Sequence, residues 1–184
     1  MVAVVSMIIP AHSVIEVHRL LVSNAVQETP IAGDVPAQLV SHGLQCAMLL
    51  AASHPDDLSL QLAGLLHDVG LLLVLGDELG HPQHASDYVR PLFGDRCADL
   101  IALHVTAQRY LERTIAGYRV VPPPTAAFAA QPDEMIDPER EAFEKHALFL
   151  PALELRRADD AANEEIRPFD RLPLWLTRMG DGAR

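Results

Sequence analysis

The chain carries little positive charge, and what it carries is almost entirely arginine. Lys145 is the single lysine among 184 residues, and the formal net charge is −11. Nucleic-acid binding draws most of its affinity from basic side chains that contact phosphates, so neither DNA nor RNA is an expected partner. Any anion that the protein binds must be held by arginine, by backbone N–H groups or by metal.

Cysteine and long apolar segments are also scarce. Cys46 and Cys97 lack the spacing of a zinc site and fall in apolar helical patterns. This favours buried thiols in a reducing cytoplasm over disulfides. The apolar opening over residues 1–10 has no basic segment before it and is too short to span a bilayer. We therefore expect a cytoplasmic protein without a signal peptide or a membrane anchor.

Aromatic residues make up 5% of the chain, and the chain contains only 10 glycines. Apolar residues, in contrast, make up 49%. A composition rich in Ala and Leu favours helix over sheet, and a length of this order fits one domain. The sequence thus predicts an all-α fold. We expect one domain over residues 1–184, with a core from about 13 to 165 and a C-terminal tail packed on its surface around Trp175.

Periodic apolar positions with start and stop signals predict a series of helices. They span approximately residues 13–28, 34–53, 57–69, 81–93, 95–112, 138–146 and 151–165. Asp34 is the expected cap of the second helix and Asp56 or Asp57 that of the third, while Gly94 separates the fourth from the fifth. Residues 117–138 lose the periodicity and include consecutive prolines, which predicts a functional loop.

Some of the histidines lie within or beside apolar helical stripes, where an unpaired imidazole is costly to bury. They are His42, His67, His81 and His104. Metal ions are an economical common partner, because neutral imidazole is a frequent ligand whose other N–H can bind a backbone or carboxylate acceptor. The alternative is a set of core histidines that are each satisfied separately.

The adjacent pair His67-Asp68 favours the metal interpretation. Neighbouring residues on a helix diverge by about 100°, so one of the pair can bind one metal while the Asp carboxylate bridges to a second. Helical bundles hold dimetal centres with clusters of this kind. A set of imidazoles and carboxylates suits iron or manganese better than magnesium, which prefers oxygen and water.

This pattern resembles the HD superfamily, a helical fold of metal-dependent phosphohydrolases with a smaller branch of diiron oxygenases. The resemblance is carried by His42, by His67-Asp68 and by a late Asp, within the segments SHGLQCA, AGLLHDVG, LHVTAQRYL and LRRADD. Together these segments are most similar to the mixed-valent diiron oxygenases that cleave 2-amino-1-hydroxyethylphosphonate, and more distantly to myo-inositol oxygenase. The resemblance covers roughly residues 30–165.

The resemblance implies an HD-domain helical bundle with a central dimetal site that holds two iron ions (Fe²⁺/Fe³⁺), with manganese or another divalent metal as an alternative. The implied ligands are His42, His67, Asp68, His81, His104 and Asp159. Asp68 would bridge the metals, and His67 and Asp68 would be central to catalysis. Such an enzyme uses O2 to oxidise and cleave a small substrate. The alternatives are an HD phosphohydrolase acting on a phosphoester or nucleotide, and a non-catalytic metal- or ligand-binding protein.

The substrate clamp of the phosphonate enzymes is only partly present. Gln108 stands where they have a lysine, and Leu71 where they have a histidine. Arg156 matches a family arginine that could hold an anion bidentately. The residues expected to contact the substrate are Gln108, Arg156, Thr125, Arg109 and Asp34. We therefore expect a small hydroxylated or amino-bearing substrate, less anionic than a phosphonate, and a protein that is a monomer or a homodimer.

Overall fold

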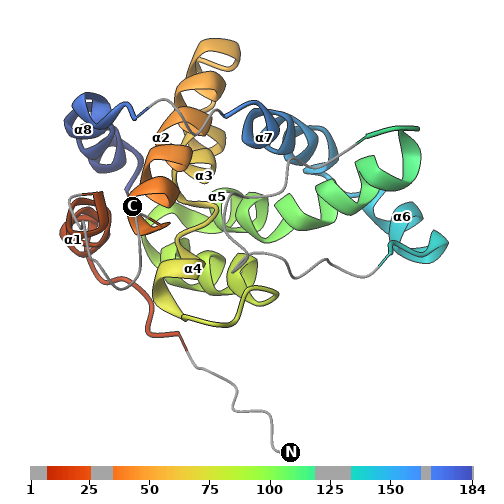
Figure 1. Ribbon diagram of the computed structural model, residues 1–184, viewed down its shortest axis with the longest axis horizontal. Coiled ribbons are helices and arrows are strands. Elements are labelled where there is room, and N and C mark those ends of the chain that lie inside the picture. The colour runs from red at the N-terminus through yellow and green to blue at the C-terminus, as the bar shows by residue number, and fades with distance from the viewer. Residues whose placement is uncertain (1–7, 26–34, 119–133, 163–166, 184) are drawn as a thin grey trace, which may run out of the picture.

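The computed structural model describes residues 8–25, 35–118, 134–162 and 167–183 of the chain. Within these residues the secondary structure is α-helical apart from one short 3-10 helix, and no strand is present (Figure 1). The all-α fold class is thereby confirmed. The elements are α1 (Val14–Ala25), α2 (Val35–Ser53), α3 (Leu58–Leu66), α4 (Gly70–Leu73), α5 (His81–Thr114), α6 (Asp137–Glu144), α7 (Phe149–Ala161), η2 (Phe169–Arg171) and α8 (Leu172–Gly182).

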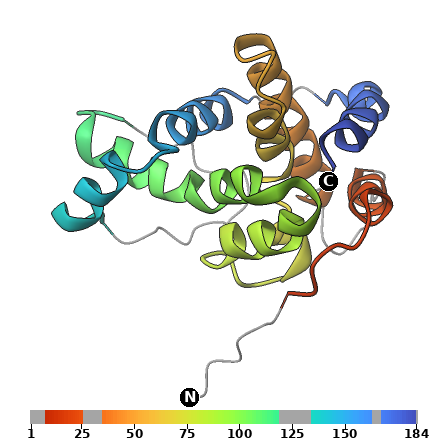
Figure 2. The ribbon, with the colours of Figure 1, turned by 180° about the vertical axis from the view of Figure 1, so that it is seen from behind.

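The centre of the molecule is built from α2, α3, α5 and α7, and in it α3 and α7 each contact the other three helices. Figures 1 and 2 show α1 and α8 together at one end of the molecule and α6 at the other. The backbones of α2 and α3 approach closely at Gly43, where an added Cβ atom would lie 2.4 Å from the carbonyl oxygen of Leu65. A residue larger than glycine would not fit at position 43. Gly43 is next to His42 in the sequence, and Leu65 is two residues before His67, so this close approach brings the two histidines near each other.

Among the described residues, α2 alone is long and apolar enough to cross a membrane by length and composition, and half of its apolar stretch is buried inside the molecule. A core helix meets the same criterion. The buried side chains of α2 include Val40, Leu44, Cys46 and Leu50, and they pack in the main apolar core. The apolarity of α2 is therefore accounted for by its place between α1, α3 and α7.

The long helix α5 is two helical arms joined at Gly94. This glycine has φ 78° and ψ 176°, a backbone region that is essentially restricted to glycine. The helix break predicted at Gly94 is thus confirmed as a kink. Arg90 spans it, because its guanidinium donates to Asp95 at 2.9 Å and to Asp99 at 2.7 Å.

The kink determines which residues of α5 can meet. In a straight helix, His81 and His104 would be about 34 Å apart along the axis, since each residue adds about 1.5 Å. Their Nε2 atoms are instead 3.0 Å apart. The first arm therefore folds back against the second, and α5 contributes two imidazoles to one place.

The C-terminal segment is helical and packs against the rest of the molecule. It forms α8, in which Trp175 is 1% exposed and Met179 is fully buried. Gly182 lies close to Leu62 and Leu58 of α3, with 2.6 Å between an added Cβ and a Leu62 methyl carbon. The segment thus supplies core residues, because its apolar positions pack against α3 and α1.

Candidate metal centre

Six imidazole and carboxylate side chains come together from separate elements. His42 lies on α2, His67 caps the end of α3, and Asp68 follows it in the turn before α4. His81 begins α5, and the remaining two are His104 in the second arm of α5 and Asp159 on α7. They form two groups, the first of His42, His67 and Asp159 and the second of Asp68, His81 and His104, and in each the potential ligand atoms lie within 4.8 Å of one another.

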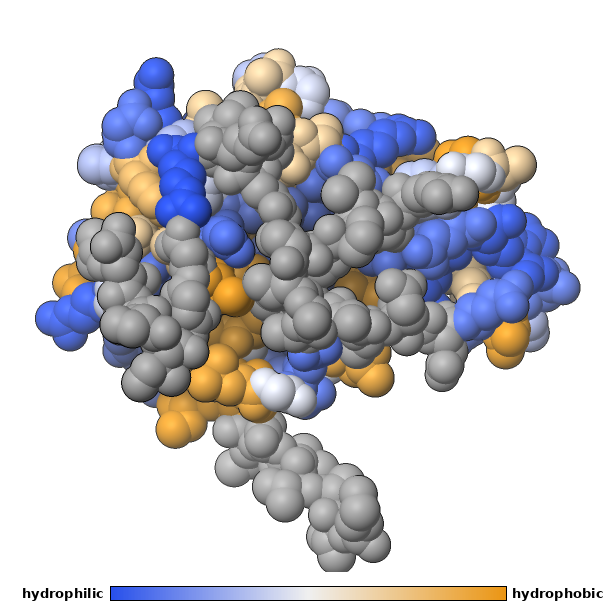
Figure 3. All heavy atoms as spheres, in the orientation of Figure 1, coloured by the Kyte–Doolittle hydropathy of each residue, from blue (hydrophilic) through white to orange (hydrophobic). Residues whose placement is uncertain are grey.

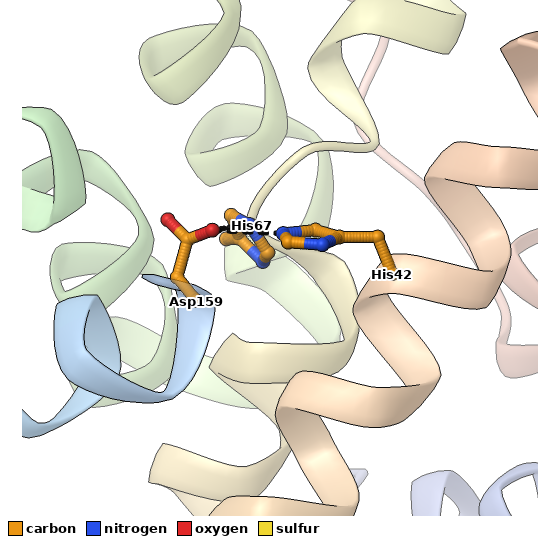
Figure 4. A group of neighbouring side chains, drawn as sticks. All are labelled: His42, His67 and Asp159. Carbon is orange, nitrogen blue, oxygen red and sulfur yellow. Dashed lines mark hydrogen bonds and ion pairs between the residues drawn. The ribbon is translucent and has the colours of Figure 1, made fainter. Parts of the chain in front are cut away.

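The first group is centred on one carboxylate oxygen. Asp159 Oδ1 lies 2.8 Å from His42 Nε2 and 3.6 Å from His67 Nε2. Figure 4 shows His42 and Asp159 directed toward His67 from opposite sides. The His67 side chain is 1% exposed, so this group is closed to bulk water on the His67 side.

The second group is built around a close pair of imidazoles. His81 Nε2 and His104 Nε2 are 3.0 Å apart. Asp68 Oδ1 lies 3.3 Å from the first and 3.7 Å from the second. The Asp68 side chain is 20% exposed, which makes it the most exposed of the three.

Asp68 joins the two groups. Its Oδ1 atom faces His81 and His104, whereas its Oδ2 atom lies 3.4 Å from His67 Nε2 in the first group. One carboxylate that presents separate oxygens to two sets of ligands has the geometry required of a bridge between two metal ions.

Backbone carbonyls fix the tautomers of three of the imidazoles. His67, His81 and His104 each direct Nδ1 to the carbonyl oxygen three residues earlier, those of Gly64, Glu78 and Ile101. A carbonyl oxygen can only accept, so each Nδ1 carries its hydrogen and donates it. In the neutral rings, each Nε2 therefore presents a lone pair to the cluster. This is the arrangement by which proteins orient metal-bound histidines.

The donor set fits metal ions. His67 Nε2 is buried and has no hydrogen-bond partner within the described residues. The two Nε2 lone pairs of His81 and His104 face each other at 3.0 Å, which is unfavourable unless a cation lies between them. Ligands about 2.1 Å from a metal and at right angles to each other are roughly 3 Å apart, close to the separations within both groups.

The electrostatics favour ionised carboxylates and positive charge at the centre. Burial raises the pKa of Asp68, but His67 and His81 outweigh it and hold that pKa well below its usual value. For Asp159, Arg156 and His67 outweigh burial in the same direction, and its pKa is also held well below the usual value. Burial, with the neighbouring imidazoles, lowers the pKa of His104 to about 3, so this ring is neutral.

His67 shows the demand for a cation most clearly. Burial alone lowers the pKa of a histidine, yet Asp68 and Asp159 hold the pKa of His67 well above its usual value. A positive charge is therefore stabilised at Nε2 even in a fully buried ring. A metal ion bound there supplies that charge.

Gly70 is a residue of the site that sequence reasoning did not single out. An added Cβ at Gly70 would lie 2.0 Å from the carbonyl oxygen of His81. The turn that follows Asp68 therefore packs directly against the first residue of α5. The glycine after the His67-Asp68 pair was the available signal, but the partner of its close contact lies 11 residues away and could not be read from local pattern.

Arg156, an expected substrate contact, lies against Asp159, and Gln108 lies against Arg156. Arg156 was expected to hold an anion, but its guanidinium pairs with Asp159 at 2.8 Å and also with Asp160. Gln108 accepts from Arg156 Nη1 at 3.1 Å and donates to Glu112 at 3.3 Å. In this structure both side chains are engaged within the protein, because α5 and α7 pack against each other.

Of the other three expected substrate contacts, Arg109 is the one that lies within the described residues. Arg109 pairs with Glu139 at 2.7 Å and donates to the Glu134 carbonyl oxygen. These bonds connect α5 to α6, whose end of the molecule is strongly hydrophilic (Figure 3). Asp34 and Thr125 lie outside the described residues.

A small hollow lies beside Asp68. Apart from the carboxylate, its lining is apolar and comes from α1, α2, α3 and the turn and helix that follow. The lining residues are Leu21, Leu39, Val40, Leu65, Val69 and Leu72. The hollow leaves no room for a water-sized molecule, so in this structure it is a gap in the packing between these elements.

No protein-family model matches the chain. It is 31% identical over 134 residues to the hydroxymethylphosphonate dioxygenase of Gimesia maris. The aligned segment covers 67% of this chain and 66% of that protein. It is also 28% identical over 139 residues to an uncharacterized protein of Acanthamoeba polyphaga mimivirus. That alignment covers 67% of this chain and 64% of the viral protein. The chain thus spans slightly less than two thirds of the length of each relative. The chain is therefore a distant relative of a dioxygenase, with a similarity at the level of a superfamily.

Proposed function

We propose that the protein is an HD-domain non-haem diiron oxygenase that uses O2 to oxidise and cleave a small substrate bearing a hydroxyl or amino group. The observation that carries the proposal is the position of Asp68 between two groups of ligands, with one oxygen toward each. The similarity to the Gimesia maris dioxygenase supports the same reaction class.

Each group would hold one iron ion. His42, His67 and Asp159 would hold the first, and Asp68, His81 and His104 the second, with Asp68 shared between them. When bound, a pair of irons supplies the redox chemistry that O2 requires and a Lewis acid for a substrate hydroxyl. The nitrogen and carboxylate donors suit iron or manganese.

The chain itself positions these groups and controls access. The carbonyls of Gly64 and Ile101 keep the Nε2 lone pairs of His67 and His104 directed inward. Burial of both rings excludes water behind the centre, while Asp68 remains partly exposed beside the apolar hollow. We expect a substrate to meet the second set of ligands on the side of the partly exposed Asp68 carboxylate.

The substrate class follows from the charges near the centre. A phosphonate dianion needs charge-assisted hydrogen bonds, each worth about 1.5–3 kcal/mol. Arg156 already neutralises part of the charge of Asp159 and Asp160, and Gln108 is uncharged. We therefore propose a hydroxylated or amino-bearing substrate of low negative charge. The activity named for the Gimesia maris relative makes hydroxymethylphosphonate the most informative comparison compound.

The test is O2 consumption by iron-loaded, partly reduced protein across hydroxymethylphosphonate, 2-amino-1-hydroxyethylphosphonate, small polyols and amino acids. We expect O2 uptake with at least one low-charge compound and weak uptake with the phosphonates. Asp68→Ala should abolish it. His84→Ala is the matched control, because His84 also lies on α5 but pairs with Asp77 at 2.7 Å instead of the cluster.

The outcomes separate the possible functions. Efficient turnover of a phosphonate would support the oxygenase reaction but contradict the proposed low-charge substrate class. Phosphate release from simple phosphoesters without O2 uptake would instead assign the protein to the hydrolases of the HD superfamily. Metal uptake with neither reaction across the panel would support a binding protein.

A further inference from the structure

The buried guanidinium of Arg156 holds the carboxylate that anchors the first group. The Arg156 side chain is 8% exposed, and its Nη1 atom lies 2.8 Å from Asp159 Oδ2. The other oxygen of Asp159 is the one that faces His42 and His67. Figure 4 shows this division, with one Asp159 oxygen directed at His67 and the other turned away.

Arg156 is itself held in place by two further side chains, Asp160 and Gln108. Its Nε atom donates to Asp160 Oδ1 at 2.9 Å, and its Nη2 atom donates to the same oxygen. Its Nη1 atom donates to Gln108 Oε1 at 3.1 Å. Every nitrogen of the guanidinium therefore has a partner inside the protein, and two of those partners are carboxylates one helical turn away on α7.

Asp160 is fixed from its far side by Tyr118, whose hydroxyl donates to Oδ2. Burial and Asp160 together raise the pKa of Tyr118 to about 12, so the phenol keeps its proton and remains a donor. The contacts form a continuous chain from Tyr118 through Asp160 and Arg156 to Asp159. Because Tyr118 follows α5 whereas the others lie on α7, the chain also fixes the orientation of α7 beside the centre.

We propose that Arg156 is a positioning residue, which fixes Asp159 so that a single oxygen is presented to the first metal ion, and that it is not the substrate's anion clamp. The inference rests on the proposed metal centre. Groups that orient metal-bound carboxylates and imidazoles typically contribute 10- to 100-fold to metal affinity. Arg156 contacts Asp159 alone among the six clustered side chains, so its effect should be confined to one ion.

The test compares Arg156→Gln with Arg157→Gln in metal binding without any substrate. Arg157 is the matched control, because it is the next residue on α7, carries the same charge, and is 57% exposed in a pair with Glu154. Metal-free protein is equilibrated anaerobically with Fe²⁺ over a range of free concentrations, and bound iron per chain is counted. Far-UV circular dichroism of each metal-free protein shows whether the variant is folded.

We expect Arg157→Gln to bind two ions like the wild type, and Arg156→Gln to bind one ion normally and the other about 10- to 100-fold more weakly. Arg156→Lys should restore part of the loss, because its ammonium can reach Asp159 but cannot satisfy Asp160 and Gln108 together. If Arg156→Gln fails to fold, Tyr118→Phe gives a milder version of the same test, with a few-fold loss at the same ion.

Two results would overturn the inference, and they are distinguishable. Normal binding of both ions by Arg156→Gln would contradict the positioning role and leave the metal centre intact. Failure of the wild type to bind iron would remove the metal centre and the inference with it. Equal weakening of both ions would also contradict the proposal, since Arg156 touches only the first group.

Discussion

Among single residues, Asp68 and His42 are expected to have different consequences when removed. Asp68 presents one oxygen to each group, whereas His42 belongs to the first group alone. Asp68→Ala should therefore lose both metal ions, and His42→Ala one. Metal counts per chain on the purified variants measure this directly. Equal losses from the two variants would contradict the bridging position of Asp68.

The close contacts of glycine explain why these residues meet. Gly43 allows α2 to approach α3 beside His42, and Gly70 allows the turn after Asp68 to reach His81. In both places a methyl group would lie within 2.5 Å of a backbone oxygen, so the helices would have to separate. The histidines and carboxylates provide the potential ligand atoms, and these glycines allow the backbones that carry them to approach closely.

At the scale of elements, the kink in α5 is required for the second group of ligands. Gly94 has backbone angles that an L side chain adopts only with strain of order 1–3 kcal/mol. Gly94→Ala should lower the free energy of unfolding by about that amount and weaken metal binding at His81 and His104. Urea unfolding and metal counts measure the two effects.

Gly180→Ala is the control for this prediction. Gly180 lies within α8, and an added Cβ there would meet no atom within 4 Å. This variant should be neutral or slightly more stable, because alanine loses less conformational entropy than glycine in a helix. Equal stability of the two variants would show that the conformation at Gly94 is not restrictive.

The start of α3 gives a prediction for pH. Asp57 accepts from the Leu60 N–H at 3.0 Å and pairs with Arg96 at 2.5 Å. Burial raises its pKa, but these contacts outweigh it and lower the pKa below the usual value. A carboxyl group with a lowered pKa stabilises the fold above its ordinary pKa of about 3.9, and that contribution is lost as the pH falls through the lowered value.

Asp57→Ala should therefore cost about 0.5–2 kcal/mol at neutral pH, mainly through the lost cap. Asp57→Asn keeps a capping oxygen and removes only the charge, so it should be milder. The difference in unfolding free energy between wild type and Asp57→Asn should shrink as the pH falls below about 4. A difference that stays constant down to the acid transition would contradict the role of the Arg96 pair.

At the scale of the whole molecule, the features predicted from sequence are the local ones. Apolar periodicity and capping residues lie within a few positions of the helices they define. The all-α class, a helix break at Gly94 and a cap at Asp56 or Asp57 were therefore predictable, and the structure places the cap at Asp57. The packing of Trp175 and the engagement of Arg156 depend on partners distant in sequence. Neither set of contacts could therefore be read from the local sequence pattern.

The six residues of the candidate metal centre were predictable only in part from local sequence. The pairing of His67 with Asp68 is visible in the sequence, whereas the meeting of His81 with His104 depends on the kink folding one arm of α5 onto the other. Their expected roles as ligands rested on a family resemblance, and the structure adds the division into two groups. The net charge of −11 keeps nucleic acid an unfavourable partner, and this remains a prediction, as do a cytoplasmic location and the oligomeric state.

The central claim is that the two groups hold a pair of iron ions bridged by Asp68. The most direct measurement is anaerobic iron loading followed by metal counting and low-temperature EPR of the partly oxidised protein. We predict two irons per chain and the signal of a spin-coupled Fe²⁺/Fe³⁺ pair, both lost in Asp68→Ala. A protein that binds a single iron, or two irons whose spins show no coupling, would contradict the account.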